Sequence, residues 1–336
     1  MAFFGTGKLP ADFLESCLSK IPLVDPRVLV SGRIGEDAAV IQFGDRFLLA
    51  KSDPITFAAD RPGWYAVQVN ANDIAVMGGE CRWFLATLLL AEGSTDEKSA
   101  ASVFDDIAAA CRELNVQLVG GHTEVTPGLD RTIVAGTMLG EVSRENFYSK
   151  DRIREGDLLL LTKALAVEGT SLLAREFGRR LEEKFPSSVV TRAANFLYQP
   201  GISVVREARI AMNAGRVQAM HDPTEGGLAT ALSELAARSN KGIVLDLGAV
   251  PLYRETEEFC TFFGLDPLGL IASGSLLIAC APESSQDIIV ALRAEGIPCA
   301  QIGKVVGQEE GLSMIDKGER KPLRLFKRDE ICRLFD

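Results

Sequence analysis

The sequence predicts an α+β protein of two domains. At about 150 residues per domain, a length of 336 residues suggests two, and each half is long enough to bury a core of its own. Hairpin-like strands are mixed with helices in both halves, which favours α+β over a single doubly wound sheet. Residues 143–156 are polar and rich in charge, so we place the boundary there and expect domains over residues 1–150 and 151–336.

The first half carries clear local signals. Apolar residues at helical spacing predict an amphipathic helix over 11–21. Gly44-Asp45 separates two apolar runs, 37–43 and 46–51, and predicts a hairpin. Pro62-Gly63 opens a helix that ends at Gly78-Gly79. The remaining expected elements are a buried strand over 82–91, a helix from a capping box at 94–97 to Leu114, and strands over 116–119 and 131–142.

The second half predicts strands and helices that alternate without a short repeat. The strongest signal is a helix over 224–239, which has Leu228, Leu232 and Leu235 on one side. The other expected helices cover 169–180, 187–197, 202–213, 284–295 and a short C-terminal segment, 328–335. The expected strands cover 157–162, 216–220, 243–247, 275–281 and 300–306.

Composition and charge exclude several classes of protein. Lys and Arg number 36 against 46 Asp and Glu, so the formal net charge is −10 and no basic footprint for nucleic acid is expected. The seven cysteines are odd in number and include no C-x-x-C pair, which favours reduced thiols in a cytoplasmic protein. We expect no membrane association, because no apolar run is long enough to span a bilayer and residues 1–8 do not resemble a signal peptide.

Four acidic residues lie in turn or strand-end contexts that can point a carboxylate into a cleft. Carboxylates of this kind hold Mg²⁺ together with substrate phosphates. Taken singly, each is more often a cap or turn residue. One of the four, Asp73, is the only ionisable acid or base in 64–79, so its helix should be buried and its carboxylate should need a partner or a metal. The candidate metal ligands are Asp37, Asp53, Asp73 and Asp222.

Two glycine-rich segments could approach a phosphate closely. Gly120-Gly121 follows a short strand, and Gly226-Gly227 opens the helix over 224–239. Neither is a Walker A loop, and paired glycines in turns are most often structural. The chain's two histidines, His122 and His221, both lie in these segments, which raises the odds that at least one has a role in the site.

Taken in order, these motifs resemble the superfamily of aminoimidazole ribonucleotide (AIR) synthase, which includes the hydrogenase maturation factor HypE, selenophosphate synthetase and thiamine-monophosphate kinase. The segment 35–39 is similar to a G-D-D-A-A signature with Glu36 for the first Asp, and 72–78 is similar to an N-D-[LI]-x-x-M-G helix. The segment 120–128 resembles a G-G-E-T-x-E-x-P-G loop with His122 for the first Glu. Residues 222–228 are close to D-P-T-R-G-G-L with Glu225 for the Arg, and 264–268 also resemble HypE.

The resemblance implies a two-domain AIR synthase-like fold whose N-terminal domains pair into a β-barrel in a homodimer. It implies ATP- and Mg²⁺-dependent activation of an amide or similar oxygen on a small-molecule or protein-borne substrate. Metal-mediated phosphate binding would fall to Asp37, Asp53, Asp73 and Asp222. By the same resemblance, the residues that contact the nucleotide would be Asn72, Thr123, Glu124, Gly226 and Gly227. Lys51 and His122 would balance charge or transfer protons.

Two alternatives stay open on the sequence alone. The substitutions at Glu36, His122 and Glu225 also permit a non-catalytic nucleotide-binding or assembly protein on the same fold. HypE carries its substrate on a C-terminal Cys, whereas Cys332 is followed by four residues, two of them apolar. Because burial of those apolar side chains favours a docked helix, we expect Cys332 to be a packing residue.

Overall fold

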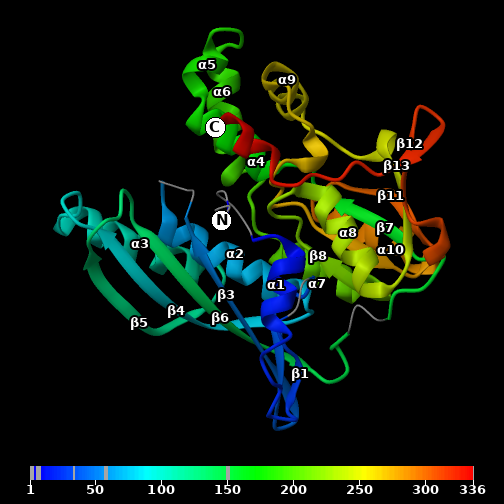
Figure 1. The fold of residues 1–336 in the computed structure, drawn as a ribbon, viewed down its shortest axis with the longest axis horizontal. Helices are drawn as coiled ribbons and strands as arrows, with labels where there is room; N and C mark the ends of the chain where they lie inside the picture. Colours follow the sequence, from blue (N-terminus) through cyan, green and yellow to red (C-terminus); the bar gives the residue numbers. More distant parts are fainter. Residues whose placement is uncertain (1–3, 5–8, 33–34, 57–59, 149–151, 336) are drawn as a thin grey trace. The chain divides into compact units, whose positions relative to one another are not determined.

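The computed structural model describes residues 4, 9–32, 35–56, 60–148 and 152–335, which divide into two compact units (Figure 1). The N-terminal unit comprises Leu23–Gly32 and Glu36–Phe147. The C-terminal unit comprises the described residues of 1–22, 33–35 and 148–336, among them helix α1 (Ala11–Leu18). Each unit combines a mixed sheet with helices, which confirms the α+β prediction. In the described part of the chain, no helix is both long and apolar enough to cross a bilayer.

The N-terminal unit is built on a six-stranded sheet in the order β1-β2-β3-β6-β4-β5. Phe43 pairs with Arg46, so the hairpin predicted at Gly44-Asp45 is confirmed. β4 and β5 run parallel, and the other neighbours are antiparallel. The strands are β1 (Val28–Val30), β2 (Ala39–Phe43), β3 (Arg46–Ile55), β4 (Glu80–Ala91), β5 (Gln117–Thr126) and β6 (Ile133–Ser143).

Helix α2 (Pro62–Val76) lies on this sheet, and α3 (Glu97–Glu113) packs against α2 (Figure 1). Nearly every residue of α2 is buried, as the scarcity of charge over 64–79 predicted. Glycines of β6 allow the close approach: a Cβ on Gly140 would lie 2.3 Å from a methyl of Ile74, and one on Gly136 would lie 2.7 Å from Asn70 Nδ2. α2 is therefore held rigidly against the strands that carry the candidate site.

Two predictions for this unit are wrong in detail. The capping box of α3 is formed by Asp96 and Ser99, not by residues 94–97, because the Asp96 carboxylate accepts a hydrogen bond from the Ser99 amide at 2.7 Å. The segment beginning at Gly120 is not a loop. It continues β5 to Thr126, where the parallel ladder to β4 supplies backbone hydrogen bonds that local glycine content does not predict.

The C-terminal unit is built on a seven-stranded sheet in the order β13-β12-β9-β11-β7-β10-β8. Its strands are β7 (Leu158–Thr162), β8 (Val217–His221), β9 (Gly242–Asp246), β10 (Leu277–Cys280), β11 (Cys299–Val306), β12 (Leu312–Asp316) and β13 (Glu319–Pro322). Its further helices are α4 (Val167–Glu176), α5 (Gly178–Glu182), α6 (Ser187–Ala194), α7 (Val205–Ala214), α8 (Gly227–Ser239), α9 (Arg254–Phe263) and α10 (Ser285–Ala294).

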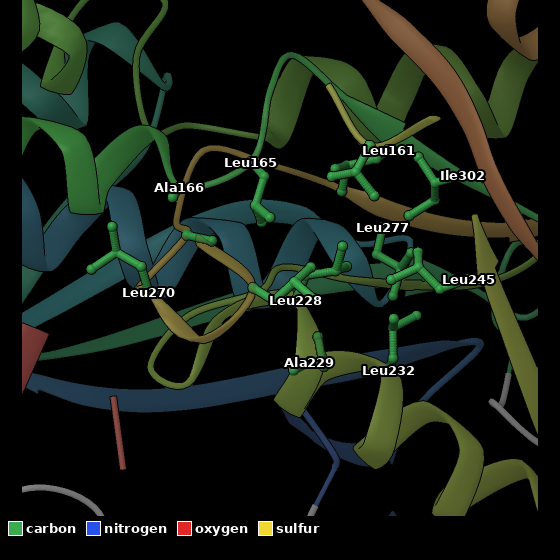
Figure 2. Packing of buried hydrophobic residues seen from close by; sticks show 14 of the residues in the cluster. Leu161, Leu165, Ala166, Leu228, Ala229, Leu232, Leu245, Leu270, Leu277 and Ile302 are labelled. Atoms are coloured by element: carbon green, nitrogen blue, oxygen red, sulfur yellow. The ribbon is translucent and has the colours of Figure 1, made fainter. Parts of the chain in front are cut away.

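The core of this unit lies between α8 and the sheet. Figure 2 shows Leu228 and Leu232 of α8 beside Leu245, Leu277 and Ile302 of three strands. All five side chains are excluded from solvent. The apolar stripe that predicted α8 is therefore the face that packs on the sheet, at roughly 1.5–3 kcal/mol for each large side chain buried.

Some elements of the C-terminal unit differ from prediction. The expected helix over 169–180 is two helices, α4 and α5, which meet at Phe177. α9 and the β12-β13 hairpin have no counterpart among the predicted elements. Polar residues in these segments interrupt the apolar periodicity that would predict a helix or a strand. Their apolar side chains are buried by packing against the rest of the C-terminal unit.

The C-terminal segment is docked, as predicted for a terminal helix. Residues Glu330–Leu334 form a 3-10 helix whose apolar residues Ile331 and Leu334 pack against the core. The ring of Phe335 lies 5.3 Å from that of Phe177, and Arg333 donates to the Gly264 carbonyl at 3.1 Å. Cys332 is held inside this docked helix.

Candidate functional site

The first group of candidate residues lies where β3 meets α2 in the N-terminal unit. Lys51 Nζ lies 3.2 Å from Asp53 Oδ2 and 3.3 Å from Asp73 Oδ1. Asp53 and Lys51 project from β3, and Asp73 projects from α2. The Asp73 side chain is 7% exposed and that of Asp53 is 39% exposed. The structure thus brings Asp73 of α2 to Lys51 and Asp53, two candidates from one short segment of β3.

Asn70 holds this junction in place. Its Oδ1 accepts a hydrogen bond from the Asp53 amide at 2.9 Å, and its Nδ2 donates to the Asp53 carbonyl at 3.2 Å and to the Ala66 carbonyl at 2.8 Å. One buried amide therefore ties the backbone of β3 to α2 beside Asp53. In the sequence, Asn70 stands out only as a polar residue one helical turn before Asp73.

Two carboxylates that converge on one positive centre fit a divalent cation. Asp53 Oδ2 and Asp73 Oδ1 both approach the Lys51 ammonium, so the same two oxygens lie close enough to one positive centre to hold a metal ion that is bound to a phosphate. Hard oxygen donors of this kind suit Mg²⁺. The neighbouring Cys81 thiol donates to the Ala71 carbonyl at 3.5 Å. Burial raises the pKa of Cys81 to about 12, and the Asp73 charge adds to the rise, so the thiol stays protonated at neutral pH.

The candidates of β5 form a separate, exposed group. His122 Nε2 lies 3.2 Å from Glu124 Oε2, and Thr126 Oγ1 donates to Glu124 Oε1 at 3.0 Å. These hydrogen bonds, that of His122 first, hold the pKa of Glu124 below its usual value. Thr123 projects to the other face of the strand. Two strands, β6 and β4, lie between β5 and β3 in the sheet. The His122–Glu124 group on β5 is therefore separate from the Lys51 group on β3.

Two further N-terminal candidates are buried. Asn72 is fully buried within α2, and Asp37 is 5% exposed just before β2. Burial of polar side chains at these positions is costly unless they have partners, which is consistent with a role in the site or in its support.

In the C-terminal unit, the candidates surround the start of α8. His221 ends β8, and its Nε2 lies 3.0 Å from Glu234 Oε2 of α8. Asp222 follows and is 2% exposed. Gly226 and Gly227 both have positive φ, and a Cβ on Gly227 would lie 2.5 Å from the Leu268 carbonyl oxygen. Only glycine allows α8 to begin so close to that loop.

Two further acids of this unit, Asp329 and Glu168, were not predicted from the sequence. Asp329 Oδ2 accepts a hydrogen bond from the Gly226 amide at 2.7 Å, and its Oδ1 accepts one from the Ile331 amide at 2.9 Å. Glu168 lies in the first turn of α4. Burial raises the pKa of Glu168 to about 8 and that of Asp329 to about 6, and the Glu225 carboxylate adds to both. In the sequence, the one indication was that Glu168 is a single acid within the mostly apolar segment 164–174.

Comparison with known proteins defines the class to which this chain belongs. Residues 35–142 match the N-terminal domain of AIR synthase related proteins, and residues 154–315 match the C-terminal domain. The chain belongs to the AIR synthase related protein family.

Within that family, the chain is similar to hydrogenase maturation proteins. It is 28% identical over 289 residues to a putative hydrogenase expression/formation protein of Methanocaldococcus jannaschii, covering 83% of this chain and 82% of that protein. It is 31% identical over 260 residues to the carbamoyl dehydratase HypE of Azotobacter vinelandii, covering 76% and 73%. A crystal structure of the hydrogenase maturation protein HypE in complex with ATP superposes with a TM-score of 0.72 at 26% identity, covering 90% of each chain.

Proposed function

We propose that this protein is an ATP- and Mg²⁺-dependent enzyme that activates an amide or similar oxygen by phosphoryl transfer, in the manner of a HypE-like hydrogenase maturation protein. The observation that carries the proposal is the convergence of Asp53 and Asp73 on Lys51. The solved relative with bound ATP supports the nucleotide. Phosphoryl transfer asks mainly for positioning and charge stabilisation, which such a cluster supplies.

The proposed roles follow the chemistry of each side chain. Magnesium would neutralise the phosphates when bound. The ligands would be carboxylates, and Lys51 would balance charge beside them. His122, paired with Glu124 on an exposed strand, would handle protons. The proposed metal ligands are Asp37, Asp53, Asp73 and Asp222, and the proposed nucleotide contacts are Asn72, Thr123, Glu124, Gly226 and Gly227.

The proposed assembly is a cytoplasmic homodimer formed through the N-terminal unit. Among the described residues, β5 is the last strand of the sheet and its one neighbour is β4. Almost all of its residues are exposed, including the apolar side chains of Val119 and Val125. A long exposed edge strand ordinarily has a partner or a cover, and a second copy of this edge would provide it.

The proposed substrate is an amide that is not attached to Cys332. Glu330 accepts a hydrogen bond from the Asp266 amide at 2.9 Å and pairs with Arg333 at 2.8 Å, so the residues on both sides of Cys332 are anchored. A carrier thiol would have to break these contacts and expose Ile331 and Leu334. We therefore propose a free small molecule, or an amide borne by another protein, as the substrate.

Magnesium-dependent ATP binding tests this function. ATP should raise the melting temperature of the protein only when magnesium is present, because only the native state binds the complex. Asp73→Asn and Asp222→Asn should each abolish the shift and leave the unliganded protein folded. Asp105→Asn, at an exposed position of α3, is the matched control and should keep the full shift. No shift at millimolar ATP and magnesium in a folded sample would refute the proposal.

ATP turnover separates an enzyme from a nucleotide-binding assembly protein. Turnover that rises when candidate amides are added, together with a dehydrated or displaced product, supports the enzyme. Binding without turnover across the amide series would favour the assembly protein.

A further inference from the structure

The Lys51 side chain places its ammonium against both carboxylates of the N-terminal unit that are brought together as metal ligands. Its Nζ lies 3.2 Å from Asp53 Oδ2 and 3.3 Å from Asp73 Oδ1. One ammonium therefore balances charge on two acids that come from different elements, β3 and α2. The chain's own positive charge lies at the oxygens that would hold the metal.

The backbone that carries these two carboxylates is fixed. Asn70 of α2 accepts a hydrogen bond from the Asp53 amide at 2.9 Å and donates to the Asp53 carbonyl at 3.2 Å. Asp53 pairs with Gly136 of β6, where a Cβ would lie 2.7 Å from Asn70 Nδ2, so this close packing requires glycine. A change in the Lys51 side chain should therefore leave Asp53 and Asp73 close together.

The exposure of the three side chains suits an exchange of one cation for another. The Asp73 side chain is 7% exposed, and a carboxylate buried to that degree depends on nearby positive charge. The Asp53 side chain is 39% exposed, so an ion can reach it from solvent. The Lys51 side chain is 21% exposed, and its flexible four-carbon stem allows the ammonium to move.

The charges make the ammonium and a metal ion competitors for the same oxygens. Two carboxylates and one ammonium carry two negative charges and one positive charge. If Mg²⁺ arrived while the ammonium stayed, three positive charges would lie beside these two carboxylates, and like charges at short range repel each other. The phosphates of a nucleotide bring negative charge that relieves this repulsion. Lys51 should therefore disfavour magnesium alone and favour magnesium together with a phosphate.

We propose that Lys51 competes with magnesium for Asp53 and Asp73 and makes binding of the metal conditional on the nucleotide. Without ligands, the ammonium pairs with the two carboxylates. When magnesium and ATP bind, the ammonium leaves the carboxylates and pairs with phosphate oxygens. This inference rests on the proposed function, because it concerns the regulation of the same site.

Titration of magnesium chloride alone into the full chain, measured by calorimetry at constant ionic strength, tests the proposal. Without nucleotide, Lys51→Met should bind magnesium about tenfold more tightly than the wild type does, a usual size for a coupling between sites. Lys51→Arg keeps the charge and should bind magnesium as weakly as the wild type. Lys98→Met, which removes a lysine at an exposed position of α3, is the matched control and should also behave as the wild type.

A non-hydrolysable ATP analogue measures the dependence on the nucleotide. The analogue should tighten magnesium binding by a larger factor in the wild type than in Lys51→Met, because the variant has no competing charge for the phosphates to draw away.

Thermal unfolding gives an independent measurement of the same competition. Without divalent metal, Lys51→Met should melt at a lower temperature than the wild type, because the buried Asp73 carboxylate loses a nearby positive charge. Magnesium should then raise the melting temperature of the variant more than that of the wild type. If Lys51→Met does not fold, Lys51→Gln replaces it in every measurement, since glutamine keeps N–H donors and removes the charge.

Two results would overturn the inference. They are magnesium binding by Lys51→Met that is no tighter than that of the wild type, and an effect of the ATP analogue on magnesium binding that is equal in the two proteins. Failure of the proposed function looks different. A wild type without an ATP-dependent shift, together with tighter magnesium binding by Lys51→Met, would refute the proposed function and support the competition between Lys51 and the metal.

Discussion

Replacing Glu168 by Gln should make the C-terminal unit more stable at high pH. In the folded protein, burial raises the pKa of Glu168 from 4.5 to about 8, and nearby carboxylates add to the rise. Below pH 4.5 the group is protonated in both the folded and the unfolded states and contributes nothing to the pH dependence. Between 4.5 and 8 the unfolded state loses its proton first, so the free energy of unfolding falls as pH rises.

The expected size follows from the same values. One pKa unit corresponds to about 1.4 kcal/mol, so the difference between 4.5 and about 8 corresponds to about 5 kcal/mol lost above pH 8. A glutamine side chain does not titrate, so the variant does not lose this free energy of unfolding as pH rises. The free energy of unfolding of Glu168→Gln minus that of the wild type should therefore grow by several kcal/mol from pH 5 to pH 8 and then stay level.

The assay must report on the C-terminal unit. Both tryptophans, Trp64 and Trp83, lie in the N-terminal unit, so amide hydrogen exchange in β7, β10 and α8 is the better measure. Tryptophan fluorescence serves as an internal control, because the unfolding of the N-terminal unit should not respond to Glu168→Gln. A stability difference that is flat across pH 5 to 9, or that shrinks as pH rises, would refute the reasoning. The matched control Glu183→Gln, at an exposed position of the same unit, should show no difference at any pH.

Three further predictions concern assembly, the C-terminal segment and a buried ion pair. Sedimentation at micromolar concentration should show a dimer that Val125→Lys on β5 disrupts and that Val290→Lys, at an exposed position of the C-terminal unit, leaves intact; a wild-type monomer would contradict the dimer. Intact-mass analysis after incubation with ATP and a carbamoyl donor system should show no adduct on Cys332, and Cys332→Ser should keep the ATP turnover of the wild type; an adduct there would restore a carrier role. Lys163 Nζ contacts Glu207 at 2.8 Å and the carbonyls of Gly201 and Ser203 at 3.0 and 2.6 Å. Lys163→Met should therefore lower the free energy of unfolding by about 3–5 kcal/mol, measured in urea, whereas an effect below about 1 kcal/mol would show that the pair is not buried in solution.

The sequence by itself determined the elements whose signals are local. Apolar spacing predicted α8, a glycine-containing turn predicted the β2-β3 hairpin, and the scarcity of charge over 64–79 predicted that α2 is buried. The order of the acidic and glycine-rich motifs along the chain predicted the AIR synthase family. These features depend on residues within a few turns of one another, where periodicity and turn chemistry are sufficient.

Only the tertiary structure decided which candidates meet. Lys51 and Asp73 lie 22 positions apart, and their contact depends on α2 packing across β3. The hydrogen bond from the Asp53 amide to Asn70 Oδ1 depends on the same packing. The extension of β5 required its parallel neighbour β4. Asp329 reaches Gly226 across 103 positions of the chain. No local pattern encodes such a contact, because it exists only once the sheet order and the packing of whole elements have brought distant segments to one place.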